Sequence, residues 1–308
     1  MNVRSSPLPL FVLATTIWGS TWLVIKWQLG VVAPEVSVAY RFALAAAVLG
    51  GFCLLTGRSL RFAARDHALF ALQGALMFGF SYLCVYWAEQ HIVSGLVAVV
   101  FALFTVMNVF TQRLMYGTPV TARAIAGATL AVAGVAVLFV PELAAVRGDR
   151  ETVLGIGLAL AGTALSALGG LPAARVHQRG HPVMSTSAWA MLYGAALTAA
   201  VAALRGRPWA FDASPSYVAS LAYLALAGTV VSFVAYLALM RRVGMARASY
   251  TGVWIPVIAL LLSTAFEGYR LTLYTLAGAA LVVAGNLIVL RRDRGSAAAD
   301  RRRRAALR

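Results

Sequence analysis

A nine-residue stretch occurs twice in this chain, and it constrains the fold more than any other feature of the sequence. Ala-Gly-Ala-Thr-Leu-Ala-Val-Ala-Gly at residues 126–134 returns as Ala-Gly-Ala-Ala-Leu-Val-Val-Ala-Gly at residues 277–285. Seven of the nine positions keep their residue type, at a constant offset of 151 positions. Repeats in solenoid proteins are far shorter, roughly 20–50 residues. The repeat therefore predicts a molecule built of two halves.

Positions outside the apolar stretch keep the same register. The offset of 151 also matches, without a gap, two further pairs: Gly117 with Gly268, and Ser81 with Ser232. Further upstream, Pro34 matches Pro182 at an offset of 148, which indicates a short insertion or deletion. Two helices rich in Ala, Gly and Val can share small residues by chance. Because the agreement extends beyond the apolar stretch, we interpret it as a duplication.

The composition is that of a membrane protein. Of 308 residues, 61% are hydrophobic and 12% are charged, with a mean hydropathy of +0.81. Soluble domains carry about 25% charged and about 45–50% apolar residues. The only cysteines, Cys53 and Cys84, lie inside apolar runs. This placement predicts neither a disulfide framework nor a metal site, and nothing in the sequence indicates a cofactor.

Ten apolar runs have the length that crosses a bilayer, about 20 residues. They lie at residues 8–28, 33–56, 67–88, 92–115, 121–141, 152–174, 183–204, 215–240, 246–266 and 271–290. A polar connector at residues 141–151 separates the first five from the last five. The sequence thus predicts an all-α integral membrane protein with ten transmembrane helices. Its expected parts are five-helix repeats at 8–141 and 152–291 and a basic tail at 292–308. Arg4 and the first run imitate a signal peptide, but no cleavage site follows, so we expect that run to be retained.

Basic residues between the runs gather on one side of the predicted membrane. Eleven lie on the side of the tail: Arg4, Arg58, Arg61, Arg65, Arg113, Arg123, Arg175, Arg179, Arg241, Arg242 and Arg247. Five lie opposite: Arg147, Arg150, Arg205, Arg207 and Arg270. The positive-inside rule then places both termini in the cytoplasm of a plasma or inner membrane. We attribute the net charge of +16 to contact with anionic lipid at the tail rather than to nucleic acid. His177 and His181, in the basic segment 175–182, are expected to be solvated.

An odd number of helices in each half has a geometric consequence. The first half begins in the cytoplasm, so the second half begins outside, and the two halves insert in opposite orientations. Inverted repeats of this kind are common in secondary transporters, which bind substrate near the midplane between the repeats. The arrangement favours a transporter of small molecules.

Several short motifs agree with this interpretation. They are Trp18-Gly-Ser-Thr-Trp22 in the first run, Pro34 with Arg41-Phe42 in the second, and the repeated Gly-Ala-x-Leu-x-Val-Ala-Gly stretch. Together with the two five-helix repeats, they make residues 8–291 resemble EamA-type members of the drug/metabolite transporter superfamily. The resemblance implies a plasma-membrane exporter of small metabolites such as amino acids or amphipathic compounds. It also implies a central cavity between the first, third and fourth helices of each half.

Aromatic residues at helical spacing suggest where such a cavity lies. One helix face of the first run carries Thr15, Trp18, Trp22 and Lys26, and one face of the third carries Phe78, Tyr82, Tyr86 and Glu89. Tyr236, Tyr250 and Trp254 offer a wall from the second half. The predicted substrate-binding residues are therefore Trp18, Trp22, Tyr82, Tyr86, Tyr236, Tyr250 and Trp254. A packing seam between helices, or an aromatic belt at the membrane interface, is the alternative for each of them.

Three ionisable residues lie in or at the rim of the first-half helices: Lys26, Arg41 and Glu89. Arg41 is about 12 Å deep in its helix at 1.5 Å per residue, where an unpaired charge is costly. We predict that Glu89 pairs with Lys26 or Arg41 to form an outer gate or to bind a zwitterion. Snorkelling to the headgroups is the alternative for Lys26 and Glu89.

Other protein classes fit the sequence less well. Small multidrug-resistance relatives in the superfamily use a glutamate in the middle of the first span for proton coupling, but this chain has Thr15, Thr16 and Ser20 there. Proton antiport by that mechanism is therefore not expected, and facilitated or differently coupled export stays open. No His or Asp lies in the middle of any predicted span, so we expect no intramembrane enzyme. A receptor or scaffold does not require an inverted duplication. A lipid or sugar-nucleotide carrier of the same architecture stays open, as does the choice between monomer and homodimer.

Overall fold

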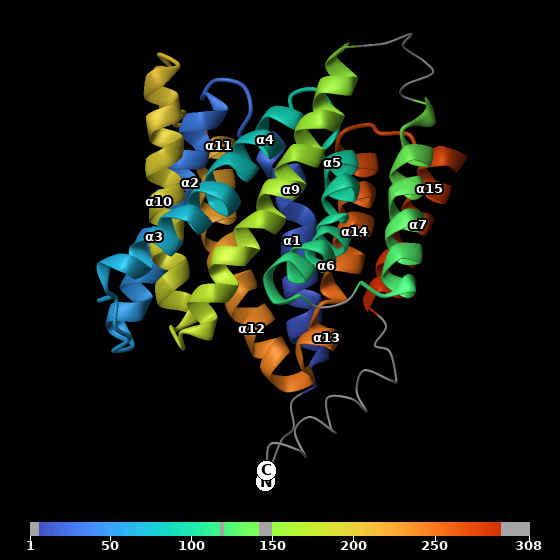
Figure 1. The fold of residues 1–308 in the computed structure, drawn as a ribbon. Helices are drawn as coiled ribbons and strands as arrows, with labels where there is room; N and C mark the ends of the chain where they lie inside the picture. The colour runs from blue at the N-terminus through green and yellow to red at the C-terminus, as the bar shows by residue number, and fades with distance from the viewer. Residues whose placement is uncertain (1–5, 118–119, 142–149, 291–308) are drawn as a thin grey trace, which may run out of the picture.

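The computed structural model describes residues 6–117, 120–141 and 150–290, and the regular structure within these residues is entirely helical (Figure 1). Within these residues, eight helical segments are long and apolar enough to cross a membrane. They are α1 (Leu8–Lys26), α2 (Pro34–Leu55), Ala64–Ala88, α5 with the start of α6 (Ser94–Thr111), α9 (Arg150–Gln178), α10 (Val183–Leu204), Pro215–Val243 and α15 (Leu273–Leu290). Two apolar helices are shorter, α7 (Ala122–Leu138) and α14 (Thr251–Phe266).

Each of the ten predicted segments is thus helical, while the number that cross the membrane stays a prediction. Helix α6 continues to Tyr116, and the short helix α13 (Met245–Ala248) precedes α14. The predicted tail at 292–308 and most of the connector lie outside the described residues. Local chemistry sets several boundaries. Pro34 occupies the first turn of α2, where its missing N–H costs nothing, and the hydroxyl of Thr121 accepts a bond from the Ala124 amide to cap α7.

Two of the long segments contain a π-helical turn at equivalent places. Ala64–Ala88 comprises α3 (Ala64–Gln73), the π-helical η1 (Gly74–Phe80) and α4 (Ser81–Ala88). Pro215–Val243 comprises α11 (Pro215–Ala222), the π-helical η2 (Tyr223–Val231) and α12 (Ser232–Val243). Both π-helical turns end directly before the serines that the sequence repeat pairs, Ser81 and Ser232. π-Helical turns are rare and are found frequently at functional sites.

The repeated stretch forms a closely packed pair of helices. It lies on α7 and α15, and its four glycines oppose one another. A Cβ built on Gly127 would lie 2.7 Å from the carbonyl oxygen of Gly285, and one on Gly285 would lie 2.5 Å from that of Gly127. Gly134 and Gly278 oppose each other in the same way, at 2.7 and 2.6 Å. Small residues allow such close backbone approach in membrane helices.

Equivalent helices of the two halves make equivalent packing contacts. Helix α2 packs along α10, which is its counterpart in the second half (Figure 1). Helix α1 packs against α12 and α14, and its counterpart α9 packs against α4, α5 and α6. Each first helix therefore lies among helices of the other half.

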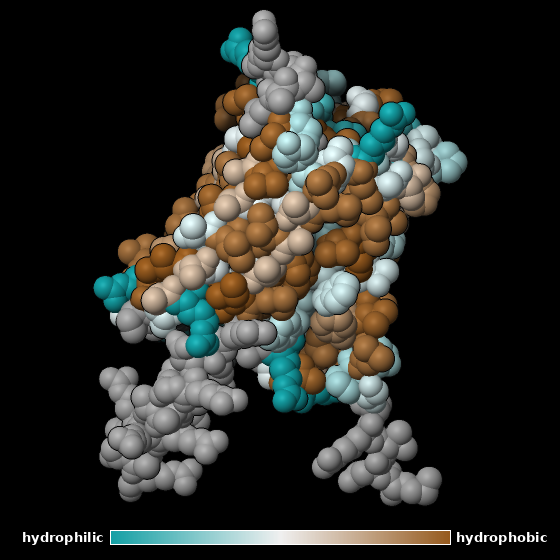
Figure 2. Space-filling model, turned by 90° about the vertical axis from the view of Figure 1, so that its right-hand side faces the viewer, coloured by the Kyte–Doolittle hydropathy of each residue, from teal (hydrophilic) through white to brown (hydrophobic). Residues whose placement is uncertain are grey.

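The outer surface is apolar across the middle of the molecule. Figure 2 shows a hydrophobic band with hydrophilic side chains at its two ends. Large apolar residues exposed on the helices include Ile125 and Val132 of α7, and Leu273 and Leu276 of α15. A surface of this kind matches the hydrocarbon core of a bilayer.

Candidate functional site

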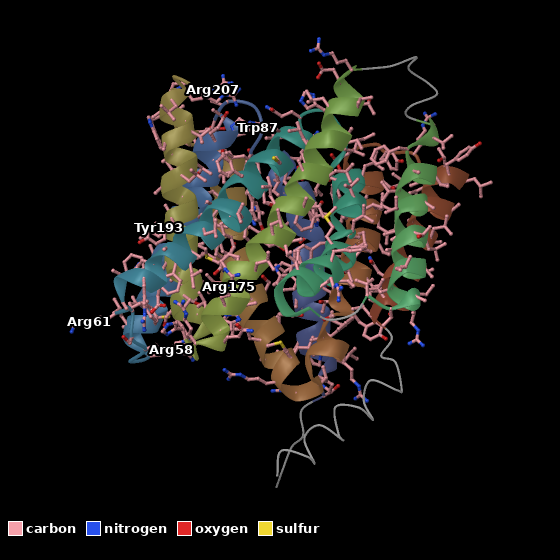
Figure 3. The ribbon with its side chains drawn as sticks, viewed as in Figure 1. Arg58, Arg61, Trp87, Arg175, Tyr193 and Arg207 are labelled. Carbon is pink, nitrogen blue, oxygen red and sulfur yellow. The ribbon has the colours of Figure 1, made fainter. Side chains whose placement is uncertain are left out.

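The two ends of the helical bundle carry different polar groups. We call the end where α1 begins, at Leu8, the near end, and the end where α1 finishes, at Lys26, the far end. In Figure 3, Arg58 and Arg61 lie toward the near end, and Trp87 and Arg207 lie at the far end. The candidate site residues lie between these ends and at the far end.

The predicted aromatic residues meet across the two halves at one point. The rings of Trp18 on α1 and Tyr236 on α12 have centroids 5.2 Å apart. The Trp18 indole N–H donates to the carbonyl of Gly228 in η2, at 3.2 Å. Nearby, the Ser20 and Tyr223 hydroxyls are hydrogen-bonded at 2.7 Å. Trp18 and Tyr236 are both partly exposed, so the first and second halves share an aromatic wall here.

The other predicted aromatic residues have different surroundings. Trp22 is 9% exposed and packs on Phe101, with ring centroids 5.1 Å apart. Tyr86 is fully buried, and its hydroxyl donates to Gln28 Oε1 at 2.6 Å. Both side chains are therefore shielded from solvent in this conformation.

Tyr250 and Trp254 do not join this group through any ring contact among the described residues. Tyr250 is partly exposed, and Trp254 is 54% exposed. Trp254 shares its face of α14 with Leu261, which lies seven residues further on and is 58% exposed. Of the seven predicted aromatic residues, only Trp18 and Tyr236 are thus joined to each other by a ring contact among the described residues. The Tyr82 ring packs on Phe42, with centroids 4.7 Å apart.

Arg41 is held inside the first half by aromatic rings. It is 2% exposed, and its guanidinium carbon lies 4.7 Å from the ring centroid of Tyr82 and 5.3 Å from that of Phe42. The Tyr86 side chain also lies beside Arg41. Its Nε and Nη1 atoms are buried without a hydrogen-bond partner. Cation–π contact stabilises a desolvated guanidinium by about 2 kcal/mol.

Lys26 and Glu89 meet at the far end, but not as the sequence predicts. The Lys26 amine donates to the main-chain carbonyl of Glu89 and not to its carboxylate. Glu89 is 0% exposed, and both of its carboxylate oxygens are buried without a hydrogen-bond partner. The expected hydrogen bond from Lys26 or Arg41 to this carboxylate is therefore not formed in this conformation, although both cations are near it.

Sequence reasoning missed a second carboxylate in the same place. Glu267, at the end of α14, accepts hydrogen bonds from the Ser94 amide at 3.3 Å and the Ser94 hydroxyl at 2.5 Å. The Ser263 hydroxyl also donates to it. Ser94 begins α5, so Glu267 of the second half ties down the start of a first-half helix, where a negative charge is favourable. The repeat gives no signal for it, because Glu267 aligns with a tyrosine, Tyr116, at the offset of 151. We call Lys26, Arg41, Glu89 and Glu267 the far-end cluster.

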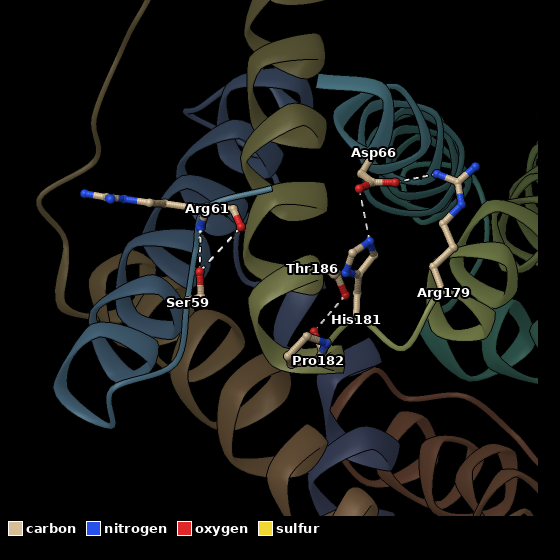
Figure 4. Close-up of polar contacts among 7 residues, drawn as sticks. All are labelled: Ser59, Arg61, Asp66, Arg179, His181, Pro182 and Thr186. Atoms are coloured by element: carbon tan, nitrogen blue, oxygen red, sulfur yellow. Dashed lines mark hydrogen bonds and ion pairs between the residues drawn. The ribbon is translucent and has the colours of Figure 1, made fainter. Parts of the chain in front are cut away.

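A separate ionic network links the halves at the near end. Asp66 of α3, whose side chain is 5% exposed, is ion-paired with Arg179 and lies 3.1 Å from the His181 Nε2 atom (Figure 4). The expectation that His181 is solvated is therefore wrong, because its ring is held by this carboxylate and packs on Phe62, with centroids 5.2 Å apart. No group of three metal-ligating side chains occurs among the described residues.

Comparison with known proteins identifies the fold. The profile of the EamA-like transporter family matches residues 6–140 and 153–291. The chain belongs to this family. One solved structure covers 93% of this chain and 97% of its own, with a TM-score of 0.65 at 20% sequence identity.

Several curated relatives carry transporter names. An uncharacterized transporter of Archaeoglobus fulgidus is 25% identical over 91% of this chain and 97% of its own. The inner membrane transporter YedA of Escherichia coli is 30% identical over 83% of this chain and 81% of its own. A "Probable terminal-alkyne amino-acid exporter" of Streptantibioticus cattleyicolor is 25% identical over 75% of this chain and 76% of its own. The chain is thus a multi-pass membrane transporter of the EamA family.

Proposed function

We propose that this transporter exports small amphipathic solutes, including amino acids, by alternating access between two inverted repeats at residues 8–141 and 152–291. The near end faces the cytoplasm and carries both termini. The reciprocal approach of Gly127 to Gly285 and of Gly134 to Gly278 supports this symmetry. A two-fold axis in the membrane plane relates helices in this reciprocal way, and it is the usual symmetry of such transporters.

The contact between Trp18 and Tyr236 carries the proposal for the substrate path. These rings come from opposite halves, so a rocking motion of one half against the other changes their separation. Aromatic faces bind apolar and cationic groups, each contact contributing roughly 0.5–2 kcal/mol. With Trp22, Tyr82 and Tyr86, they favour solutes with an apolar or aromatic body over phosphorylated ones. The name of the Streptantibioticus relative supports amino acids as one substrate class. The proposal keeps Tyr250, which is partly exposed, on the cytoplasmic side of this path, whereas Trp254 lies on the exposed face of α14.

The far-end cluster acts as the outer gate in this proposal. Glu89 and Arg41 are buried, and the Glu267 carboxylate binds Ser94 across the two halves, so this conformation is closed at the far end. Opening that end exposes Glu89 and Arg41 to water, which removes the desolvation cost of their charges. Lys26 then becomes free to leave the Glu89 carbonyl. The gate therefore links separation of the halves to hydration of buried charges.

An export screen tests the proposed function. In this screen, the transporter is overproduced in cells, and the amino acids and aromatic metabolites that appear in the medium are quantified by mass spectrometry. We expect a limited set of solutes to be released faster, and Trp18→Ala to abolish this effect. Trp209→Ala, at an exposed position in the segment after α10, is the matched control. Release that is unchanged by Trp18→Ala, with the protein present in the membrane, contradicts the proposed path.

A further inference from the structure

A pocket outside the proposed substrate path lies at the far end. It has a volume of about 550 Å³, within the range of roughly 300–1,000 Å³ typical of small-molecule sites. Its walls come from the start of α2, the end of α4, the first turns of α9 and the segment after α10. Trp87 and Arg207, which both line it, are labelled in Figure 3. None of the proposed gate or substrate-binding residues lines this pocket.

Two arginines and one glutamate give the pocket a positive side. Glu35, in the first turn of α2, is 0% exposed. Its Oε1 atom accepts a hydrogen bond from Arg205 Nη1 at 2.6 Å and lies 3.8 Å from Arg207 Nε. One carboxylate faces two guanidinium groups, so a positive charge is left over. Both arginine side chains are 44% exposed, which leaves N–H donors available to a ligand.

Apolar groups form the opposite side. Leu154 and Leu158 of α9 line the pocket with Trp87. The Trp87 ring lies 5.1 Å from the guanidinium carbon of Arg205 and fixes the orientation of that group. His91, which also lines the pocket, is bound at 2.5 Å to Glu151, so this ring already has a carboxylate partner. The pocket thus combines a positive rim with an apolar wall.

We infer that this pocket binds an anionic head group, a carboxylate or a phosphate, attached to an apolar body. The planar guanidinium presents paired N–H donors that match both of these anions. The apolar body lies on Leu154, Leu158 and Trp87. Two sources supply this chemistry, a phospholipid of the adjoining leaflet and a free amphiphilic carboxylate. The inference does not depend on export, because it concerns a separate pocket.

Fluorescence quenching tests the inference on the full chain in a nonionic detergent. The probe is 11-bromoundecanoate, whose bromine quenches nearby tryptophan. We expect saturable quenching that loses its main component in Trp87→Phe. Arg207→Gln, which leaves the Glu35–Arg205 pair intact, should weaken probe binding by about tenfold, the loss expected for one charge-assisted contact. Arg207→Lys keeps the positive charge but lacks the paired N–H donors of the guanidinium, so it should bind the probe more tightly than Arg207→Gln and less tightly than the unchanged protein. Arg270→Gln, an exposed arginine outside the pocket, is the control and should change nothing.

Two further experiments determine the source of the ligand and the sign of the head-group charge that the pocket binds. In nanodiscs, phosphatidylglycerol that displaces the probe, where phosphatidylcholine does not, identifies a lipid head group as the occupant. Equal probe binding in both kinds of nanodisc identifies a free amphiphile. A bromoundecyl-trimethylammonium probe that binds as tightly as the carboxylate overturns the inference. Undiminished carboxylate binding by Arg207→Gln, with unfolding temperature unchanged, overturns it as well.

Discussion

Gly127 of α7 lies so close to Gly285 of α15 that a methyl group on Gly127 would sit 2.7 Å from the Gly285 carbonyl oxygen. Gly127 lies near the start of the first copy of the repeated stretch, and Gly285 lies at the end of the second copy. Gly134, at the end of the first copy, contacts Gly278, near the start of the second, in the same way. The two contacts are therefore reciprocal. The duplication in the sequence has become a symmetric helix interface.

The first prediction concerns this interface. Gly127→Ala should lower stability by about 1–3 kcal/mol, the usual cost of inserting a methylene into a packed site. Thermal unfolding in detergent measures the effect. Gly157→Ala is the matched control, because Gly157 lies in α9 with no atom within 4 Å of an added Cβ. That control should be neutral or stabilising. Equal effects of the two changes would argue against a close α7–α15 contact.

The far-end cluster predicts opposite effects of two similar substitutions. Glu267→Gln should destabilise the protein by roughly 1–2 kcal/mol, because it removes one of the oxygens that bind Ser94 and Ser263. Glu89→Gln should leave stability unchanged or raise it, since it replaces a buried carboxylate that lacks a hydrogen-bond partner. Unfolding temperatures of the two variants and of the double variant measure these effects. A larger loss for Glu89→Gln than for Glu267→Gln contradicts the geometry of the cluster.

The near-end network gives a prediction about the link between α3 and the segment before α10. Asp66→Asn should cost about 1–3 kcal/mol, because it weakens bonds to both Arg179 and His181 at a largely buried carboxylate. Arg61→Gln, at an exposed arginine of the same end, should be neutral. Unfolding temperatures of both variants test this. Neutrality of Asp66→Asn would show that the network contributes nothing to the fold.

The sequence predicts the helices of this fold better than it predicts the details of the site. Apolar runs and the repeat locate ten helical segments, because burial in lipid requires long apolar helices. The π-helical turns η1 and η2 could not be predicted from a regular period of 3.6 residues, although Phe78 and Tyr82 both pack on Phe42. Periodicity also cannot distinguish a buried ring from an exposed one. Trp22 and Trp254 look alike in sequence, yet they are 9% and 54% exposed.

For charged residues, too, the sequence predicts some features of the site and not others. Depth in the second helix identifies Arg41 as unusual, and the structure surrounds it with Tyr82, Tyr86 and Phe42. The partner of Ser94 lies 173 positions away, at Glu267, and no local pattern indicates such a contact. Long-range pairing of polar groups depends on how helices cross, and a single sequence does not encode that in any simple spacing.

Membrane topology provides a further prediction. Reporter fusions after Arg150 and after Arg294 should report opposite sides of the membrane, with the second in the cytoplasm. The physical reason is the excess of basic residues in the segments on the side of the tail. Reporters that agree on one side are incompatible with two inverted repeats.

Alternating access is tested most directly by thiol labelling of the proposed path. Trp18→Cys and Tyr236→Cys are placed separately in a chain in which Cys53 and Cys84 are replaced by Ala, and a membrane-impermeant thiol reagent is applied to inside-out and right-side-out vesicles. Cysteines at both positions should react from the cytoplasmic side, which is the open side of this conformation under the proposed function. They should react more slowly from the outside. A crosslink between positions 89 and 267 would keep the far-end cluster closed, and it should abolish only the reaction from the outside. Cysteines that stay unreactive from both sides would show Trp18 and Tyr236 to be a packing seam, and the proposed substrate path would be wrong.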